Sequence, residues 1–129
     1  MEIQQGDFFY ADSALIKVES FIGNEVNPVI DKEDVMGSIN IKNLKSVMLT
    51  PTILKTIGFE KNPNNRYVLY SGIYVVEAYF NKVKDSFDLI IRIPTREEEI
   101  SLSIQELNRL KRLLEALEIR ANWDALESI

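Results

Sequence analysis

The sequence predicts an α+β fold, and three observations lead to this prediction. The first 49 residues show poor helical periodicity and are rich in β-branched side chains, which is typical of strands. Residues 66–93 alternate apolar and polar side chains with the period of two that a half-buried sheet requires. Leucines near the C-terminus recur at three- and four-residue steps, the spacing of one helix face. We therefore expect a β-rich N-terminal lobe, a short helix, an antiparallel β-meander, and a C-terminal amphipathic helix that covers the meander.

The N-terminal lobe is expected to be a small twisted sheet or a partly closed barrel. Its candidate strands are residues 7–10, 14–22, 29–30, 35–41 and 44–49. Gly23-Asn24 and Asn27-Pro28 are turn signals between them, because glycine, asparagine and proline favour tight turns. The charged residues 31–34 are expected to form a solvated turn.

A short helix is expected to begin at Thr50-Pro51. Threonine caps the first free N–H groups of a helix, and proline suits the first helical turn. Gly58 fits the left-handed position just after a helix, so the helix should have only about two turns. Its apolar face consists of Ile53, Leu54 and Ile57.

The meander is expected to begin with a hairpin of residues 66–70 and 73–80. A turn at Ser71-Gly72 would place Arg66 opposite Glu77, where their charges attract. The other face would be apolar and aromatic, with Tyr67, Leu69, Tyr74 and Val76. A third strand is expected at 87–93 and a short fourth strand at 100–102.

The last helix is expected to begin with a capping box. In this motif Ser103 would cap the helix and Glu106, three residues later, would bond back to the cap. The buried stripe would be Ile104, Leu107, Leu110, Leu113, Leu114 and Leu117. The tail with Trp123, Leu126 and Ile129 is either a second short helix or a frayed end.

Composition argues for one domain without enzymatic chemistry. The chain has 129 residues, which suits a single domain at 1–129 with lobes at 1–49 and 50–129. It has no Cys and no His, so it lacks thiol nucleophiles, the usual general base and the usual transition-metal ligands. No glycine-rich phosphate loop is present, and Glu97-Glu98-Glu99 reads as a solvated turn. We expect no enzyme activity, no catalytic residue, no cofactor and no metal site.

The N-terminal residues are acidic and polar, so no signal peptide is expected, and no apolar run is long enough for a membrane helix. A cytoplasmic location follows as the expectation.

Charge is distributed unevenly along the chain. The formal net charge is -5, yet residues 41–84 hold seven basic and two acidic side chains. Four of the five tyrosines fall in or beside this basic segment, and aromatic and basic side chains together bind nucleotides or single strands. The candidate ligand-binding residues are Lys55, Lys61, Arg66, Tyr67, Tyr70, Lys82 and Lys84. The sequence pI of about 4.8 speaks against extended nucleic-acid binding.

Several motifs resemble those of a family of small uncharacterised proteins found in phages, prophages and other mobile elements of gut anaerobic bacteria. Residues 44–50, continued through Ile53-Leu54 to residues 58–61, are similar to its Leu-Thr…Gly-Phe signature. Gly6-Asp7-Phe8 and residues 104–110 are similar to its opening step and its closing run. The chain departs from the family pattern at Ser46 and Met48, where proline is frequent, and at Gln105, where histidine is frequent.

The resemblance implies a mobile-element accessory protein and transfers no site residues. The first functional hypothesis is therefore a non-enzymatic accessory protein that binds a protein partner or itself. The alternative is a binder of a nucleotide, another small anionic ligand or a short single strand through the basic, tyrosine-rich segment.

Overall fold

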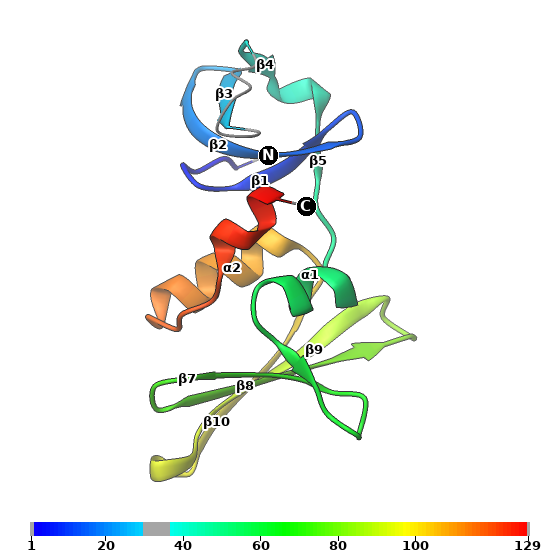
Figure 1. Ribbon diagram of the computed structural model, residues 1–129, viewed down its shortest axis with the longest axis vertical. Coiled ribbons are helices and arrows are strands. Elements are labelled where there is room, and N and C mark those ends of the chain that lie inside the picture. The colour runs from blue at the N-terminus through cyan, green and yellow to red at the C-terminus, as the bar shows by residue number, and fades with distance from the viewer. Residues whose placement is uncertain (1, 30–36, 129) are drawn as a thin grey trace. The chain divides into compact units, whose positions relative to one another are not determined.

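The computed structural model describes residues 2–29 and 37–128, and the chain divides into two units (Figure 1). Unit 1 comprises Met1–Val47 and Glu127–Ile129, and unit 2 is Met48–Leu126. Each unit has its own antiparallel sheet, and unit 2 adds two α-helices. This composition agrees with the predicted α+β class.

Unit 1 contains a five-stranded sheet in the order β4-β3-β2-β1-β5. Its strands are β1 (Phe8–Ala11), β2 (Ala14–Ile22), β3 (Glu25–Val29), β4 (Ile39–Asn40) and β5 (Leu44–Ser46). The 3₁₀ helix η1 (Ile41–Asn43) joins the two edge strands. The buried side chains that form its core are Phe9, Ala11, Ile16, Val18, Val26 and Leu44.

The predicted turn at Asn27-Pro28 is wrong, because both residues lie within β3. Pro28 pairs with Val18, and the register shifts between Val18 and Ser20. A bulge of this kind accommodates a proline in an inner strand, because proline has no N–H to give to the ladder. The predicted turn at 31–34 lies outside the described residues, as does the start of the strand predicted at 35–41.

Unit 2 contains a second five-stranded sheet, in the order β10-β9-β8-β7-β6. Its strands are β6 (Glu60–Lys61), β7 (Tyr67–Ser71), β8 (Tyr74–Asn81), β9 (Ser86–Ile93) and β10 (Glu98–Ile104). Its helices are α1 (Pro51–Thr56) and α2 (Leu107–Ala116), with a 3₁₀ turn at η2 (Pro94–Arg96). The 3₁₀ helix η3 (Trp123–Ser128) ends the described chain.

Helix α1 begins and ends where the sequence predicts. The Thr50 hydroxyl accepts the Ile53 N–H at 3.1 Å, and Pro51 occupies the first turn. Gly58 has a φ of +116°, and the N–H of Phe59 donates to the Leu54 carbonyl at 2.9 Å. Both ends are therefore closed by bonds between neighbours in the sequence.

The hairpin of β7 and β8 has the predicted faces but a different register. Ser71 pairs with Tyr74, so the connecting residues are Gly72 and Ile73. Glu77 therefore lies opposite Val68 rather than opposite Arg66. The pairing moves by two positions, and the side-chain period of a strand is also two, so each residue keeps its predicted face.

The predicted capping box at Ser103 is wrong. Ser103 lies in β10, and α2 begins at Leu107 with Glu106 as a cap residue that makes no side-chain bond. The reason is tertiary: Ser103 donates to the Asp88 carboxylate at 2.9 Å, and Ile104 is buried opposite Phe87 of β9. Leu107, Leu110 and Leu114 are fully buried as predicted, whereas Leu113 and Leu117 are only half-buried, and Leu117 is the residue just after α2.

The tail forms η3, in which Leu126 is only 1% exposed. Ile129 lies outside the described residues. None of the helices in the described part of the chain has the length and apolar composition needed to span a membrane.

Candidate functional site

Strand β10 is an edge of the unit 2 sheet, and most of its outer side is unpaired within the described residues. Near its end, the Leu49 N–H donates to the Gln105 carbonyl at 2.8 Å, so the backbone of Gln105 points outward. Backbone groups alternate sides along an antiparallel strand. Glu99, Ser101 and Ser103 therefore present their N–H and C=O groups to the outside.

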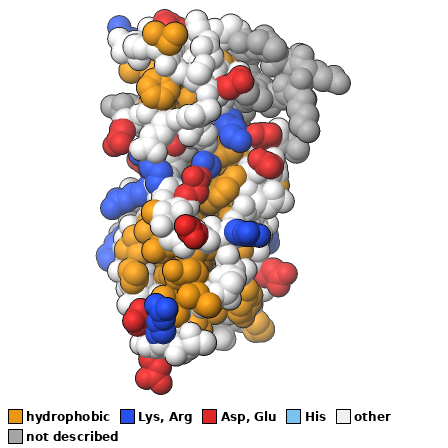
Figure 2. Space-filling view, turned by 90° about the vertical axis from the view of Figure 1, so that its left-hand side faces the viewer, with side chains coloured by type: hydrophobic (Ala, Val, Ile, Leu, Met, Phe, Trp, Pro, Cys, Tyr) orange, Lys and Arg blue, Asp and Glu red, His pale blue; other side chains and the backbone are white. Residues whose placement is uncertain are grey.

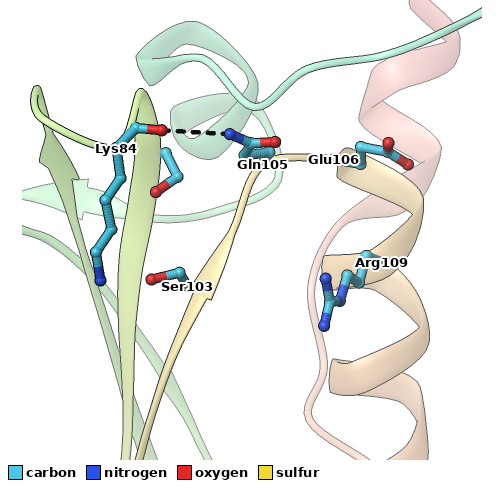
Figure 3. Close-up of a pocket in the computed structure, with 6 residues that line it drawn as sticks. Lys84, Ser103, Gln105, Glu106 and Arg109 are labelled. Carbon is cyan, nitrogen blue, oxygen red and sulfur yellow. Dashed lines mark hydrogen bonds between the residues drawn. The ribbon is translucent and has the colours of Figure 1, made fainter.

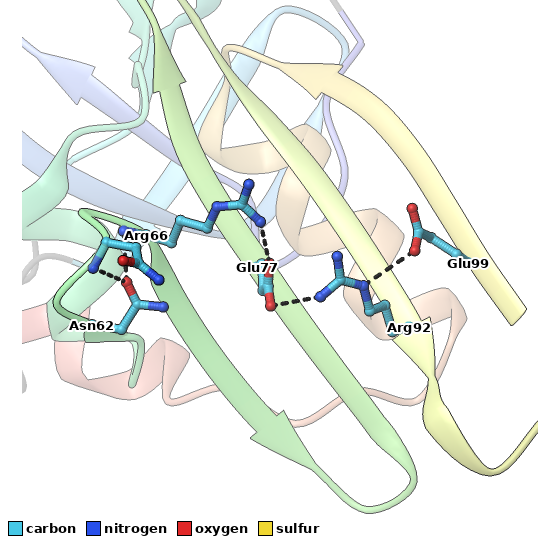
Figure 4. Close-up of polar contacts among 6 residues, drawn as sticks. Asn62, Arg66, Glu77, Arg92 and Glu99 are labelled. Carbon is cyan, nitrogen blue, oxygen red and sulfur yellow. Dashed lines mark hydrogen bonds and ion pairs between the residues drawn. The ribbon is translucent and has the colours of Figure 1, made fainter. Parts of the chain in front are cut away.

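Charged side chains form a row of alternating sign that runs from Arg66, just before β7, across β8 and β9 to β10 (Figure 4). One Glu77 oxygen accepts from Arg66 at 2.8 Å and the other from Arg92 at 2.7 Å. Arg92 also donates to Glu99 at 3.2 Å. We call Arg66, Glu77, Arg92 and Glu99 the charge ladder. Its last member lies on the open edge strand.

The opposite face of the sheet carries an apolar groove beside the same edge. A cavity of about 570 Å³ is lined by Tyr74, Ile91, Ile93, Glu98, Glu99, Ile100 and Leu117. A second hollow of about 510 Å³ adjoins it and shares Tyr74 and Leu117. Ile100 is 52% exposed. Hydrophobic side chains gather in the lower half of the view in Figure 2. Because Leu117 follows α2 directly, the groove begins where the helix stops covering the sheet.

A separate polar cavity of about 340 Å³ lies at the other end of β10 (Figure 3). Its lining residues are Lys84, Ser86, Ser103, Gln105, Glu106 and Arg109. Ser86 is 4% exposed, and its hydroxyl has no hydrogen-bond partner within the protein. The volume is typical of a small-molecule site.

Gln105 holds the turn that carries Lys84. Its side-chain amide donates to the carbonyls of Lys84 and Asp85, both at 3.3 Å. Figure 3 shows the bond to Lys84. Gln105 therefore acts as a positioning residue for one wall of the polar cavity.

Asp88 lies beside the polar cavity and has a lowered pKa. The main cause is the hydrogen bond from Asn81 at 3.1 Å, and the bond from Ser103 adds to it. Burial opposes these two bonds by raising the pKa of Asp88, and the positive charge of Lys84 makes the smallest contribution, which lowers it. Asp88 therefore stays ionised and fixes Ser103 in place. The Ser103 hydroxyl has only one hydrogen, which it donates to Asp88, so it cannot donate to a ligand.

The tyrosines of the basic segment divide between the two faces of the sheet. Tyr67 is buried on the face of Val76, whereas Tyr70, three residues later, is 74% exposed on the opposite face. Tyr79 lies under the Arg66 guanidinium at 4.9 Å, on the ladder face. Tyr67 and Tyr70 therefore do not share one stacking surface.

The basic residues predicted for ligand binding are also placed separately. Lys55 is exposed on α1 and Lys61 on β6, whereas Arg66 belongs to the charge ladder. Lys82 and Lys84 are exposed in the turn between β8 and β9, and only Lys84 lines the polar cavity.

The acidic triplet is not a simple turn, because Glu98 and Glu99 belong to β10. Glu97 alone has the left-handed turn conformation, with a φ of +54°. Within residues 2–29 and 37–128, no three acidic side chains gather closely enough to hold a metal ion.

Sequence reasoning missed Ser86, Arg109 and Glu106 as cavity residues. Arg109 and Glu106 looked like ordinary polar positions of a helix, and Ser86 like the first residue of a strand. No local signal distinguishes them, because the cavity forms only where β9, β10 and the start of α2 meet.

Comparisons with protein-family models, with curated proteins and with solved structures find no match for this chain.

Proposed function

We propose that this protein is a non-enzymatic binding protein that accepts an extended, basic segment of a partner protein on the open edge of β10. The observation that carries the proposal is the charge ladder, which ends on that edge with an acidic residue. The family resemblance adds the setting: an accessory protein of a phage or mobile element, working in the cytoplasm of a bacterial host.

The backbone of β10 supplies the affinity. The outward N–H and C=O groups of Glu99, Ser101 and Ser103 match the pairing pattern of one more antiparallel strand. Natural edges are commonly blocked by proline or lysine, and β10 contains neither. An added strand would therefore find a continuous row of partners.

The charge ladder supplies selectivity. Signs alternate from Arg66 through Glu77 and Arg92 to Glu99, so the next position outward favours a positive side chain. Residues directly opposite each other in an antiparallel pair have Cβ atoms about 5 Å apart, close enough for an ion pair. Lysine or arginine opposite Glu99 would extend the row.

The apolar groove favours particular side chains at the other positions of the partner strand. Alternate residues of an added strand face the side of Ile100, where the groove opens. Apolar residues there would bury surface, at about 25 cal/mol per Å². The favoured partner segment therefore alternates basic and apolar residues.

A second copy of this chain fits the edge less well. The net charge of -5 makes two copies repel each other, and two glutamates, Glu98 and Glu99, begin the strand. A basic partner is attracted by the same charges.

The test uses two eight-residue peptides, one alternating Lys and Val and the other Glu and Val. Titration of the ¹⁵N-labelled protein should shift the amides of 98–103 with the lysine peptide alone, and the affinity should fall as salt rises. Ser101→Pro should abolish binding without disturbing the sheet, because the Ser101 N–H points outward. Glu99→Lys should weaken binding about tenfold or more.

Glu60→Lys makes the same charge change on β6, at the other edge of the sheet, and should bind as the unmodified protein does. Equal binding of both peptides, or full binding by Ser101→Pro, would overturn the proposal. A dimer in sedimentation that Ser101→Pro dissolves would assign the edge to a second copy instead, and would also overturn it.

A further inference from the structure

We infer that the polar cavity binds a small phosphate monoester whose organic part carries hydroxyl groups, such as a sugar phosphate. This site lies apart from the partner edge proposed above and does not depend on it. Figure 3 shows Lys84 and Arg109 on opposite sides of Ser103, with Gln105 and Glu106 along the upper border.

Two cations from different elements face the cavity. Lys84 comes from the turn between β8 and β9, and Arg109 from the first turns of α2. Among the described residues neither forms an ion pair, although Lys84 is near enough to Asp88 to lower its pKa. Two cations converging on one cavity favour a ligand with more than one negative charge.

Backbone and hydroxyl donors add to this positive environment. Glu106 caps α2 without a side-chain hydrogen bond, so the first N–H groups of this ten-residue helix receive no hydrogen bond from the side chain of their cap residue. The buried Ser86 hydroxyl lines the same cavity and lacks a partner within the protein. Leaving a buried hydroxyl unpaired costs free energy, which a ligand oxygen would recover. A phosphate group offers acceptors in several directions, as these donors require.

Hydrogen-bond acceptors on the same walls favour a ligand whose organic part carries hydroxyl groups. The Ser103 hydroxyl donates its one hydrogen bond to the ionised Asp88 carboxylate, so its oxygen can only accept from a ligand. The Glu106 carboxylate also lines the cavity and accepts only. A bare anion would meet repulsion from Glu106, whereas a hydroxyl group would donate to it. The cavity of about 340 Å³ has room for such an organic part.

The experiment is calorimetric titration with ribose 5-phosphate, inorganic phosphate and ribose. Ribose 5-phosphate should bind most tightly, inorganic phosphate more weakly, and uncharged ribose not measurably. Arg109→Gln and Lys84→Gln should each weaken ribose 5-phosphate binding about tenfold or more. Lys82→Gln removes the same charge from the same turn, outside the cavity, and should leave binding unchanged.

Two further variants separate ligand binding from a structural role. Ser86→Ala should raise the melting temperature of the free protein, because it removes an unpaired buried hydroxyl, and yet weaken the binding of ribose 5-phosphate. Glu106→Gln should raise the affinity for inorganic phosphate, because it removes the repelling carboxylate. The difference in affinity between inorganic phosphate and ribose 5-phosphate should therefore become smaller.

The inference is overturned if none of the three compounds binds at millimolar concentration. It is also overturned if Lys84→Gln and Arg109→Gln bind no more weakly than Lys82→Gln. If phosphate and ribose 5-phosphate bind equally, the site takes a bare anion and the assigned ligand class is wrong.

Discussion

Asp88 shows how a single residue joins three strands of unit 2. It lies on β9, accepts from Asn81 at the end of β8, and accepts from Ser103 on β10. Both bonds need the ionised carboxylate as their acceptor, so they favour deprotonation and lower the pKa of Asp88. One charged group thereby fixes the strand that forms the edge and the serine that faces the polar cavity.

This arrangement predicts a dependence of stability on pH. Because the pKa of Asp88 is lower in the folded state, its contribution is fully present above its ordinary value of about 3.8 and is lost as the pH falls through the folded value. The difference in unfolding free energy between the unmodified protein and Asp88→Asn should therefore shrink in that acid range. Denaturant unfolding at a series of pH values measures it.

A direct titration checks the cause. In an NMR titration the Asp88 carboxyl should have its midpoint below 3.8, and Asn81→Ala should move the midpoint upward. An unmoved midpoint in Asn81→Ala would show that the amide is not the main cause.

At the scale of elements, the charge ladder ties four neighbouring segments together. Glu77 is the central member, since both of its oxygens are bonded to arginines and its side chain is only 14% exposed. Isolated surface ion pairs contribute little, whereas a shielded carboxylate with two charged donors contributes more.

Glu77→Gln should therefore lower the unfolding free energy by about 1–2 kcal/mol, because it leaves Arg66 and Arg92 without their shared carboxylate. Urea unfolding measures the change. Glu60→Gln, at an exposed position of β6 that forms no ion pair with any other described residue, serves as the control and should change the unfolding free energy by less than about 0.5 kcal/mol. Equal losses in the two variants would show that the ladder does not act as a unit.

At the scale of the whole molecule, unit 2 holds every feature proposed to bind a ligand or partner. The edge of β10, the charge ladder, the apolar groove and the polar cavity all lie within Met48–Leu126. Its buried side chains include Leu54, Ile57, Val76, Leu89, Ile91, Leu107, Leu110 and Leu114. Unit 2 thus has a core of its own.

We predict that a chain of residues 48–126 folds alone. Its stability should be modest, because a chain of about 80 residues buries only a small hydrophobic core. Thermal unfolding, followed by the fluorescence of the single tryptophan Trp123, should be cooperative. A gradual, non-cooperative change would mean that the chain folds only as a whole.

Much of the local structure was predictable because neighbouring residues decide it. Thr50 and Gly58 set the ends of α1 through bonds to residues three to five positions away. The faces of β7 and β8 follow from alternation alone, so they were correct even though the pairing register was not. The start of α2 was not predictable, because Ser103 had two uses and a distant residue, Asp88, decided between them.

By itself, the sequence determined the class of fold, the helix α1, the faces of the sheet in unit 2 and the absence of His and Cys chemistry. Only the tertiary structure decided which of the charged residues work together. Lys84 and Arg109 lie 25 positions apart in the sequence and line one cavity, whereas Tyr67 and Tyr70 are near neighbours on opposite faces. The physical reason is that strand pairing joins residues by hydrogen bonds across the sheet, and those partners cannot be read from local spacing.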